Sequence, residues 1–299
     1  MKFAVIDIGS NTIKLNIYRK RGGRFEETDS YVERTALASY KASGILSDQG
    51  VTVLINVILA LDGICRKKRV KYVFPYATQS LRDITNADEV LSRIKSETGL
   101  DVEIISGEEE ARLGFESFVS EFGTDRSGLL ADMGGGSTEL TVFDGGAVRS
   151  TVSLPFGSLS IAKDTCSGII PDTEAVLRIE KAVGDAFAAA GFCERRKTLY
   201  VTGGTASGAF RLCREYGLGG KKKIAAGDLK KLISTVQSDP EKAERKVRGL
   251  LPDRYDSVYA GIAAYTAICE KAGVETVVRS KTTCRRGYAA MIFETRLKK

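Results

Sequence analysis

Near its start the chain reads Phe3-Ala4-Val5-Ile6-Asp7-Ile8-Gly9-Ser10-Asn11-Thr12, an apolar run that ends at an aspartate and continues into a short polar turn. Such a run is typical of a buried strand, and the turn combines glycine with small polar residues. Apolar side chains then alternate at Ile13, Leu15 and Ile17, up to Arg21-Gly22-Gly23. This alternation predicts a half-buried return strand. The stretch therefore predicts a strand, a tight turn and a second, antiparallel strand.

The same pattern returns in the second half of the chain. It reads Leu129-Leu130-Ala131-Asp132-Met133-Gly134-Gly135-Gly136-Ser137-Thr138, followed by alternating apolar residues up to Asp144-Gly145-Gly146. Asp7 thus corresponds to Asp132. Two copies of one supersecondary unit predict two similar domains that face each other.

Strands and helices alternate along the rest of the chain, which predicts an α/β fold with mostly parallel sheets. We expect strands over 70–76, 102–105, 198–202 and 276–279. Helices are expected over 51–69, 87–98, 108–121, 172–190, 228–236, 239–248 and 256–272, with one more opening in the glycine-rich turn at 203–208. A polar linker at 123–126 places the boundary between an N-terminal domain over 1–122 and a C-terminal domain over 123–299. The last helix is free to return to the first domain.

The composition excludes several kinds of enzyme. The 299 residues include six Cys but no His and no Trp. A chain without histidine cannot build a Ser-His-Asp triad, a Cys-His dyad or a His-liganded zinc site. Acid–base chemistry would fall to carboxylates, Lys, Tyr, Cys or metal-bound water.

Several features predict a cytoplasmic protein. The cysteines are scattered without a C-x-x-C pair, as expected for thiols in a reducing compartment. An aspartate directly after the first apolar residues argues against a secretory signal. The longest apolar stretch, 53–61, is too short to span a bilayer, so no membrane partner is expected.

A net charge of +7 permits a polyanionic partner. Basic runs lie at 66–69, 221–223 and 242–248, although solvated helix faces explain such runs equally well. The chain contains no nucleic-acid-binding module and no aromatic-rich stacking motif, so we expect no nucleic-acid partner. The charge alone does not identify the ligand.

Three small-residue turns follow predicted strands, at 9–12, 134–138 and 203–205. Consecutive backbone N–H groups in such turns converge on an anion, and glycine permits both the dihedral angles and a close approach. One such turn is most often structural, but three in a duplicated α/β frame favour a phosphate site. Neither a P-loop nor a dinucleotide fold is supported, because both glycine fingerprints are absent.

Acidic side chains are placed where a metal ion could join those phosphates. Asp7 and Asp132 end corresponding strands, and Glu139 begins the return strand after the second turn. Mg²⁺ prefers a few carboxylates with waters and phosphate oxygens, although an Asx turn would explain either aspartate. Glu110 closes a run of three acids at a predicted helix start, where acids favour the helix dipole. Glu110 could instead face a cleft between the two predicted domains and deprotonate water there. The composition does not separate the helix-dipole role from the catalytic one.

Seven short motifs in this order resemble the exopolyphosphatase/guanosine pentaphosphate phosphohydrolase (Ppx/GppA) family of the actin-like ATPase (ASKHA) superfamily. The resemblance covers nearly the whole chain. The motifs occupy residues 4–12, 77–83, 104–113, 132–139, 153–157, 202–205 and 254–256.

The resemblance implies two duplicated actin-like (ribonuclease H-like) domains with an interdomain cleft. It also implies a Mg²⁺-dependent hydrolase that removes terminal orthophosphate from inorganic polyphosphate, or the 5′ γ-phosphate from pppGpp. By motif, Glu110 would be the catalytic base, and Asp132 and Glu139 would hold Mg²⁺. The residues expected to bind phosphate are Asp7, Ser10, Asn11, Arg82, Gly134, Gly135, Gly136, Ser137, Gly203, Gly204 and Thr205.

The chain departs from the family pattern near its C-terminus. Where the family usually has Ser-Asp-x-Gly-Leu-Arg-Glu-Gly, this chain has the basic residues Lys281 and Arg286 in place of the two acids. It also ends without the His/Asp-rich helical domain of longer members, and so resembles the short, two-domain form.

Three alternatives to an exopolyphosphatase stay open from the sequence. They are a pppGpp hydrolase, a non-catalytic sensor of polyphosphate or guanosine tetraphosphate, and an ATP-using sugar or acetate kinase of the same superfamily. A homodimer also stays open.

Overall fold

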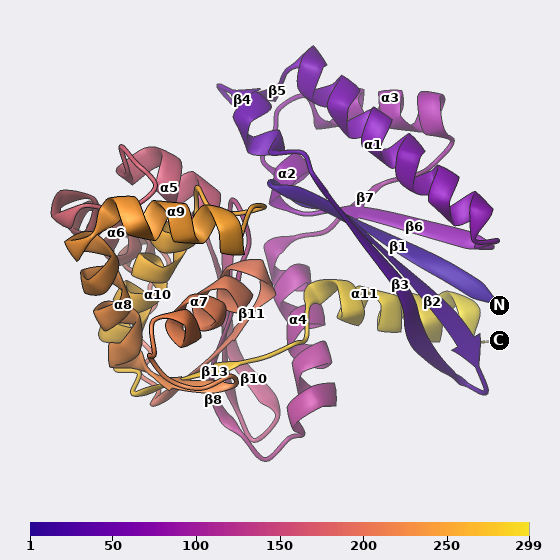
Figure 1. Ribbon diagram of the computed structural model, residues 1–299. Coiled ribbons are helices and arrows are strands. Elements are labelled where there is room, and N and C mark those ends of the chain that lie inside the picture. Colours follow the sequence, from indigo (N-terminus) through magenta and orange to yellow (C-terminus); the bar gives the residue numbers. More distant parts are fainter. Residues whose placement is uncertain (299) are drawn as a thin grey trace. The chain divides into compact units, whose positions relative to one another are not determined.

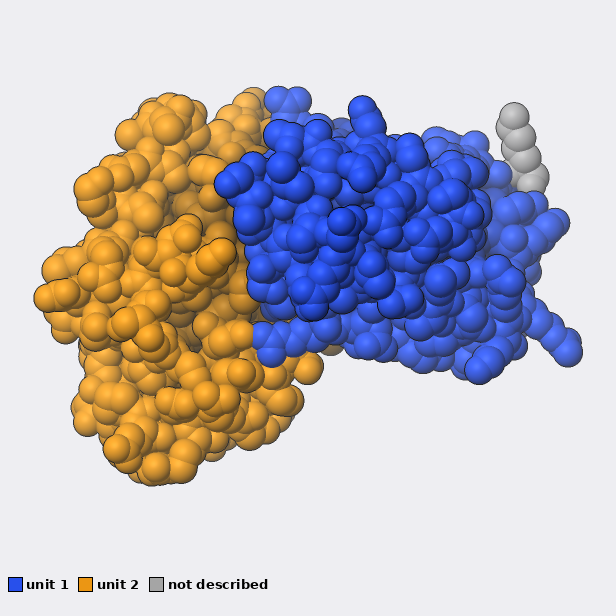
Figure 2. Space-filling model, turned by 90° about the horizontal axis from the view of Figure 1, so that it is seen from above, with its two compact units in different colours: residues 1–113, 284–299 blue, residues 114–283 orange. Residues whose placement is uncertain are grey.

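The computed structural model describes residues 1–298 and divides the chain into two compact units, coloured separately in Figure 2. Unit 1 contains residues 1–113 and the C-terminal segment that begins at Cys284, and unit 2 is Gly114–Thr283. The boundary differs from the predicted one at 122/123 because it lies inside one continuous helix, α4 (Gly107–Phe122). Leu113 packs in a core of unit 1, whereas Phe115 and Phe118 pack in a core of unit 2.

Unit 1 is built on a five-stranded sheet with the order β3-β2-β1-β6-β7 (Figure 1). The strands β1, β2 and β3 form an antiparallel meander, and β1, β6 and β7 are parallel. The strand bounds are β1 (Lys2–Ile8), β2 (Thr12–Arg21), β3 (Arg24–Arg34), β6 (Tyr72–Ala77) and β7 (Glu103–Ile104).

Helices cover both faces of this sheet. Helix α1 (Asp48–Lys67) shares one core cluster with β1 and β2, while α11 (Cys284–Ile292) and the π-helical turn η2 (Phe293–Leu297) share another with the opposite side chains of the same strands. The remaining elements of unit 1 are η1 (Leu37–Tyr40), β4 (Lys41–Ala42), β5 (Ile45–Leu46), α2 (Gln79–Arg82) and α3 (Ala87–Thr98).

Helix α1 is long and apolar enough, by length and composition, to cross a membrane. The sequence predicted no such segment. Its apolar side, including Leu54, Ile58 and Leu61, is fully buried in the core of unit 1. Packing against the sheet therefore accounts for the apolar character of this side of the helix.

Unit 2 repeats the topology of unit 1 and adds one strand. Its order is β10-β9-β8-β11-β13-β12, and again three antiparallel strands are followed by two parallel ones, before the antiparallel β12. The bounds are β8 (Ser127–Met133), β9 (Thr138–Asp144), β10 (Ala147–Leu154), β11 (Thr198–Thr202), β12 (Lys223–Ala225) and β13 (Thr276–Arg279). The shared strand order confirms the predicted duplication of one supersecondary arrangement in the two units.

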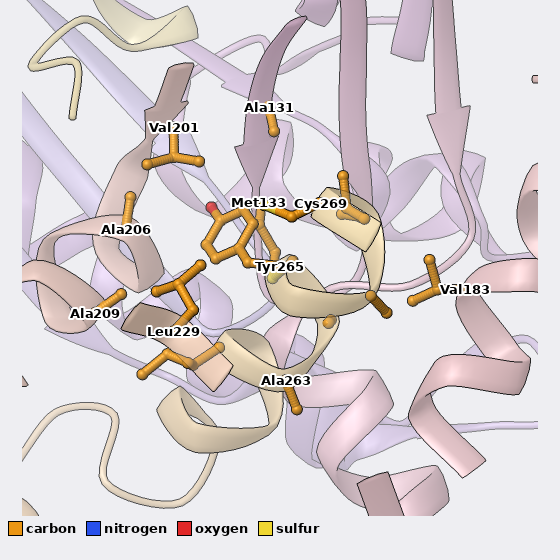
Figure 3. Close-up of a cluster of buried hydrophobic side chains, with 14 of the residues drawn as sticks. Ala131, Met133, Val183, Val201, Ala206, Ala209, Leu229, Ala263, Tyr265 and Cys269 are labelled. Atoms are coloured by element: carbon orange, nitrogen blue, oxygen red, sulfur yellow. The ribbon is translucent and has the colours of Figure 1, made fainter. Parts of the chain in front are cut away.

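The main core of unit 2 surrounds α10 (Val258–Ala272), which is buried on nearly every side. Figure 3 shows Tyr265 of this helix among small and aliphatic side chains such as Ala206 and Leu229. The other helices of unit 2 are α5 (Ser158–Thr165), α6 (Thr173–Ala189), α7 (Gly203–Glu215), α8 (Ala226–Ser238) and α9 (Pro240–Leu250).

The expectation of mostly parallel sheets is wrong, because each of the two large sheets contains an antiparallel meander of three strands, and β4 and β5 form a separate antiparallel pair. The predicted strands 198–202 and 276–279 and the helix 87–98 have the predicted bounds. Pro75 lies inside β6. This is possible because β7 pairs only with Tyr76 and Ala77, so β6 is still an edge strand at the proline.

Candidate active site

The predicted site residues fall into two groups, one in each unit. Unit 1 holds Asp7, Ser10, Asn11, Arg82 and Glu110. Unit 2 holds the remaining predicted residues, namely Asp132, Gly134, Gly135, Gly136, Ser137, Glu139, Gly203, Gly204 and Thr205.

The turn between β1 and β2 presents backbone amides in one direction. Gly9 N donates to Thr12 O at 3.2 Å, and the carbonyls of Ser10 and Asn11 accept hydrogen bonds from N–H groups of the segment 35–38 at 2.9–3.0 Å. In a trans peptide the N–H points opposite to the C=O. The N–H groups of Asn11 and Thr12 therefore point away from this segment, side by side.

The turn between β8 and β9 is held in the same way by α5. Gly134 N donates to Ser137 O at 2.9 Å, and the carbonyls of Gly134 and Gly135 accept from the first N–H groups of α5 at 2.9–3.0 Å. The N–H groups of Gly135 and Gly136 consequently point away from the helix. A β-carbon at Gly157, the N-cap of α5, would lie 2.4 Å from Gly135 C, so this packing requires glycine.

Both turns have the form that the sequence predicted for an anion site. In each turn, adjacent N–H groups point to one side, while the carbonyls of the same peptide groups accept hydrogen bonds on the other side. Such an arrangement forms a concave site for an anion. The side chains differ. Ser10 Oγ donates to Gln79 Oε1 at 3.0 Å, and Asn11 is buried with no hydrogen-bond partner for its Oδ1 among the described residues.

Asp132 and Glu139 are direct partners across β8 and β9, so their side chains lie on the same face of the sheet. Glu139 is 3% exposed and its Oε1 accepts a hydrogen bond from Ser153 Oγ at 2.9 Å. Asp132 lies beside the start of α7, because its Oδ1 is 3.0 Å from the position of a β-carbon at Gly203.

Two carboxylates suit Mg²⁺, which takes its other ligands from water and phosphate, better than they suit a metal ion whose ligands all come from the protein. Within residues 1–298 there is no group of three or more His, Cys, Asp or Glu that could hold a metal ion. Mg²⁺ is usually held by one or two carboxylates, with waters and substrate phosphates as its other ligands. The pair Asp132 and Glu139 matches that donor set.

The third predicted turn is the first turn of α7. Thr202, at the N-cap, donates its hydroxyl to the Thr282 carbonyl and does not cap the helix. The guanidinium of Arg254 lies against Gly204, where a β-carbon would come within 2.3 Å of its Nη1. The N-terminus of a helix carries partial positive charge, and an arginine beside it adds to its attraction for an anion. Sequence reasoning did not assign Arg254 to the site, although the motif 254–256 was a signal.

The structure distinguishes the acids at the start of α4. Glu109 binds Arg112 at 2.7 Å, and this hydrogen bond lowers the pKa of the Glu109 carboxyl. Glu110 instead lies 3.3 Å from Nη1 of Arg82, and its side chain is 13% exposed. The same Arg82 nitrogen donates to the Ile105 carbonyl at 3.1 Å. Two predicted site residues of unit 1, Arg82 and Glu110, thus lie in direct contact.

Asp7 has a partner that the sequence did not indicate. Its Oδ2 lies 3.1 Å from Nη1 of Arg285, in the first turn of α11. The carboxylate is therefore paired with a cation inside unit 1.

The family model of the Ppx/GppA phosphatase family matches residues 17–295. This chain belongs to the Ppx/GppA phosphatase family. Its curated relatives include exopolyphosphatase 1 of Mycobacterium tuberculosis, 27% identical in an alignment of 303 positions, gaps included, that covers 96% of this chain and 87% of that protein. Exopolyphosphatase 1 of Mycobacterium leprae is 24% identical, with coverage of 93% and 85%.

Solved structures agree with the family assignment. The Ppx/GppA family member of Aquifex aeolicus has a TM-score of 0.79 and 26% identity, with 99% of each chain covered. An exopolyphosphatase from Cytophaga hutchinsonii has a TM-score of 0.85 at 18% identity, with 98% of each chain covered, and shows the same fold. The chain thus has the fold of this family, and the family is one of phosphoanhydride hydrolases.

Proposed function

We propose that this phosphatase is an exopolyphosphatase, which releases terminal orthophosphate from inorganic polyphosphate by attack of water. The observation that carries the proposal is the presence of two amide-lined turns, at 9–12 and 134–137. Within each turn the carbonyls accept hydrogen bonds on one side, so that the N–H groups of that turn point to the other. An amide-lined turn suits phosphate oxygens. The names of the mycobacterial relatives support polyphosphate as the substrate.

Phosphoryl transfer needs an aligned water and stabilisation of the charge that develops on the phosphoryl oxygens. We assign Glu110 as the group that orients the water and accepts its proton. Arg82 holds the Glu110 carboxylate and offers its charge to the phosphoryl group. Asp132 and Glu139 would hold Mg²⁺, which neutralises phosphate oxygens when bound. The first turn of α7, with Arg254, would bind further phosphate oxygens.

Release of orthophosphate from polyphosphate tests this proposal. The purified full-length chain is incubated with polyphosphates of several lengths, with and without Mg²⁺, and free orthophosphate is measured over time. We expect release that requires Mg²⁺ and falls strongly in the Asp132→Asn variant. No release above a Glu110→Gln control would overturn the assignment.

Hydrolysis of pppGpp is the nearest second candidate, because the resemblance of the sequence motifs to the Ppx/GppA family implies either substrate. The same assay with pppGpp separates the two, since the preferred substrate has the higher kcat/KM. Tight binding of either compound without turnover would favour a sensor. Membership of a phosphatase family argues against the alternative of a sugar or acetate kinase.

We also propose a cytoplasmic location, from the scattered thiols of the sequence. The described cysteines are all free. A homodimer stays a prediction, and the mass of the native protein in solution tests it.

A further inference from the structure

The C-terminal segment supplies a cation to the first hairpin of the chain. Arg285 and Asp7, 278 residues apart, form an ion pair at 3.1 Å in which the side chains are 14% and 19% exposed. Arg285 Nε is buried without a hydrogen-bond partner among the described residues. The pair is thus enclosed within unit 1 and is not a surface ion pair.

The packing of α11 fixes this pair. Asp7 shares its face of the sheet with Phe3 and Val5, since alternate residues of a strand point to the same side. Tyr288 and Ile292 of α11 are buried in the same cluster as Phe3 and Val5. The helix therefore lies along this face and carries Arg285, in its first turn, to the carboxyl end of β1.

The two hairpins, β1–β2 and β8–β9, have the same backbone arrangement but carry different charges. In unit 2, Asp132 is opposite Glu139, so two acids occupy neighbouring positions. In unit 1, the corresponding partner of Asp7 is Lys14, and Arg285 adds a second cation. The acids of unit 2 attract a metal ion, whereas the charge of Asp7 is more than balanced by basic groups.

We propose that Arg285 is a positioning residue, which holds and neutralises Asp7 so that the turn at 9–12 accepts a phosphate group directly. This inference rests on the proposed function, because it takes a polyphosphate as the ligand. Without Arg285, the carboxylate at the end of β1 would repel that anion across a short distance. A partly buried charge would also lose its ion pair. The first turn thus depends on the last helix of the chain.

The test compares Arg285→Gln with the double variant Asp7→Asn/Arg285→Gln, in the full-length protein. We expect Arg285→Gln to raise KM for polyphosphate by about tenfold or more, with a smaller change in kcat. Removing the carboxylate as well should recover most of that loss, because nothing then repels the phosphate. A merely structural ion pair predicts recovery of thermal stability alone, so a double variant whose KM stays as high as that of the single variant overturns the proposal.

Two further variants control for charge and for folding. Arg286→Gln removes the same charge from the adjacent, exposed position, and an equal rise in KM would show a general charge effect and overturn the proposal. Arg285→Lys keeps the charge, and we expect it to retain most of the affinity. Thermal unfolding of each variant shows that the compared proteins are folded.

Binding measured in a Glu110→Gln background separates this inference from the proposed function. Calorimetry with inorganic polyphosphate gives Kd without turnover. The same order of Kd values among the Arg285 variants, with no hydrolysis by the wild type, would support the inference and overturn the enzymatic proposal. If the wild type does not bind polyphosphate, both are overturned.

Discussion

Gly287 of α11 lies directly against Leu113 of α4, so closely that a β-carbon at position 287 would come within 2.0 Å of the Leu113 carbonyl oxygen. Both residues lie close in sequence to the unit boundaries, since Leu113 precedes Gly114 and Gly287 is four residues after Thr283. The contact anchors the C-terminal segment in unit 1.

The substitution Gly287→Ala is therefore expected to destabilise the protein. The added methyl group would meet backbone, which can move only with the helix, and overpacking of this kind costs about 1–3 kcal/mol. Urea unfolding measures the change. The matched control is Gly114→Ala in α4, where a β-carbon meets nothing within 4 Å and alanine should stabilise the helix by up to about 1 kcal/mol. Equal stabilities of the two variants would contradict the close packing.

Gly157→Ala tests the amide-lined turn of unit 2. Gly157 has an extended backbone that any residue adopts, so the cost of alanine would be steric, through its contact with the backbone of 134–136. We expect the turn to move off α5 and the Kd for polyphosphate to rise by about tenfold or more, the equivalent of ~1.4 kcal/mol.

The control is Gly168→Ala, because a β-carbon at that position meets open space. Polyphosphate binding by Gly157→Ala at the wild-type level would show that the turn does not contribute to the site.

The thiols give a prediction about pH and reactivity. Burial raises the pKa of Cys65, Cys213 and Cys269 to about 12 each, so at pH 8 these groups are almost entirely protonated and unreactive. Cys193 is exposed. Titration with a thiol reagent at pH 8 should thus show one fast phase, which Cys193→Ser removes.

The buried thiols should react only on unfolding. Because their pKa is raised by folding, ionisation favours the unfolded state, and stability should decline as the pH rises above about 9. Fast reaction of several thiols in the native protein would contradict this burial.

The sequence was sufficient to predict the elements with clear periodicity, such as β11 and β13, and the duplicated hairpin itself. It did not indicate β3, because most residues of this edge strand are exposed and its sequence has no regular apolar alternation. It left open that a last helix packs on the first domain but gave no bounds for α11, because the first turn of this helix is basic and its position depends on packing against a distant sheet.

The candidate site was also predictable only in part, because its turns are local features whereas the contacts that orient them are tertiary. Glycine and small polar residues identify the turns at 9–12 and 134–138, since local backbone geometry determines such positions. The carbonyl contacts that orient them come from the distant segment 35–38 and from α5. The pairing of Asp7 with Arg285 is a purely tertiary contact, and no local pattern encodes it.

The most direct test of the central claim is the rate of orthophosphate release from polyphosphate by Glu110→Gln, compared with Glu109→Gln. The two variants remove neighbouring carboxylates from the same helix turn, but Glu109 binds the exposed Arg112, whereas Glu110 lies against Arg82. We predict that Glu110→Gln lowers kcat by about 10²–10⁴-fold and that Glu109→Gln stays close to the wild type. Wild-type turnover by Glu110→Gln would contradict the account.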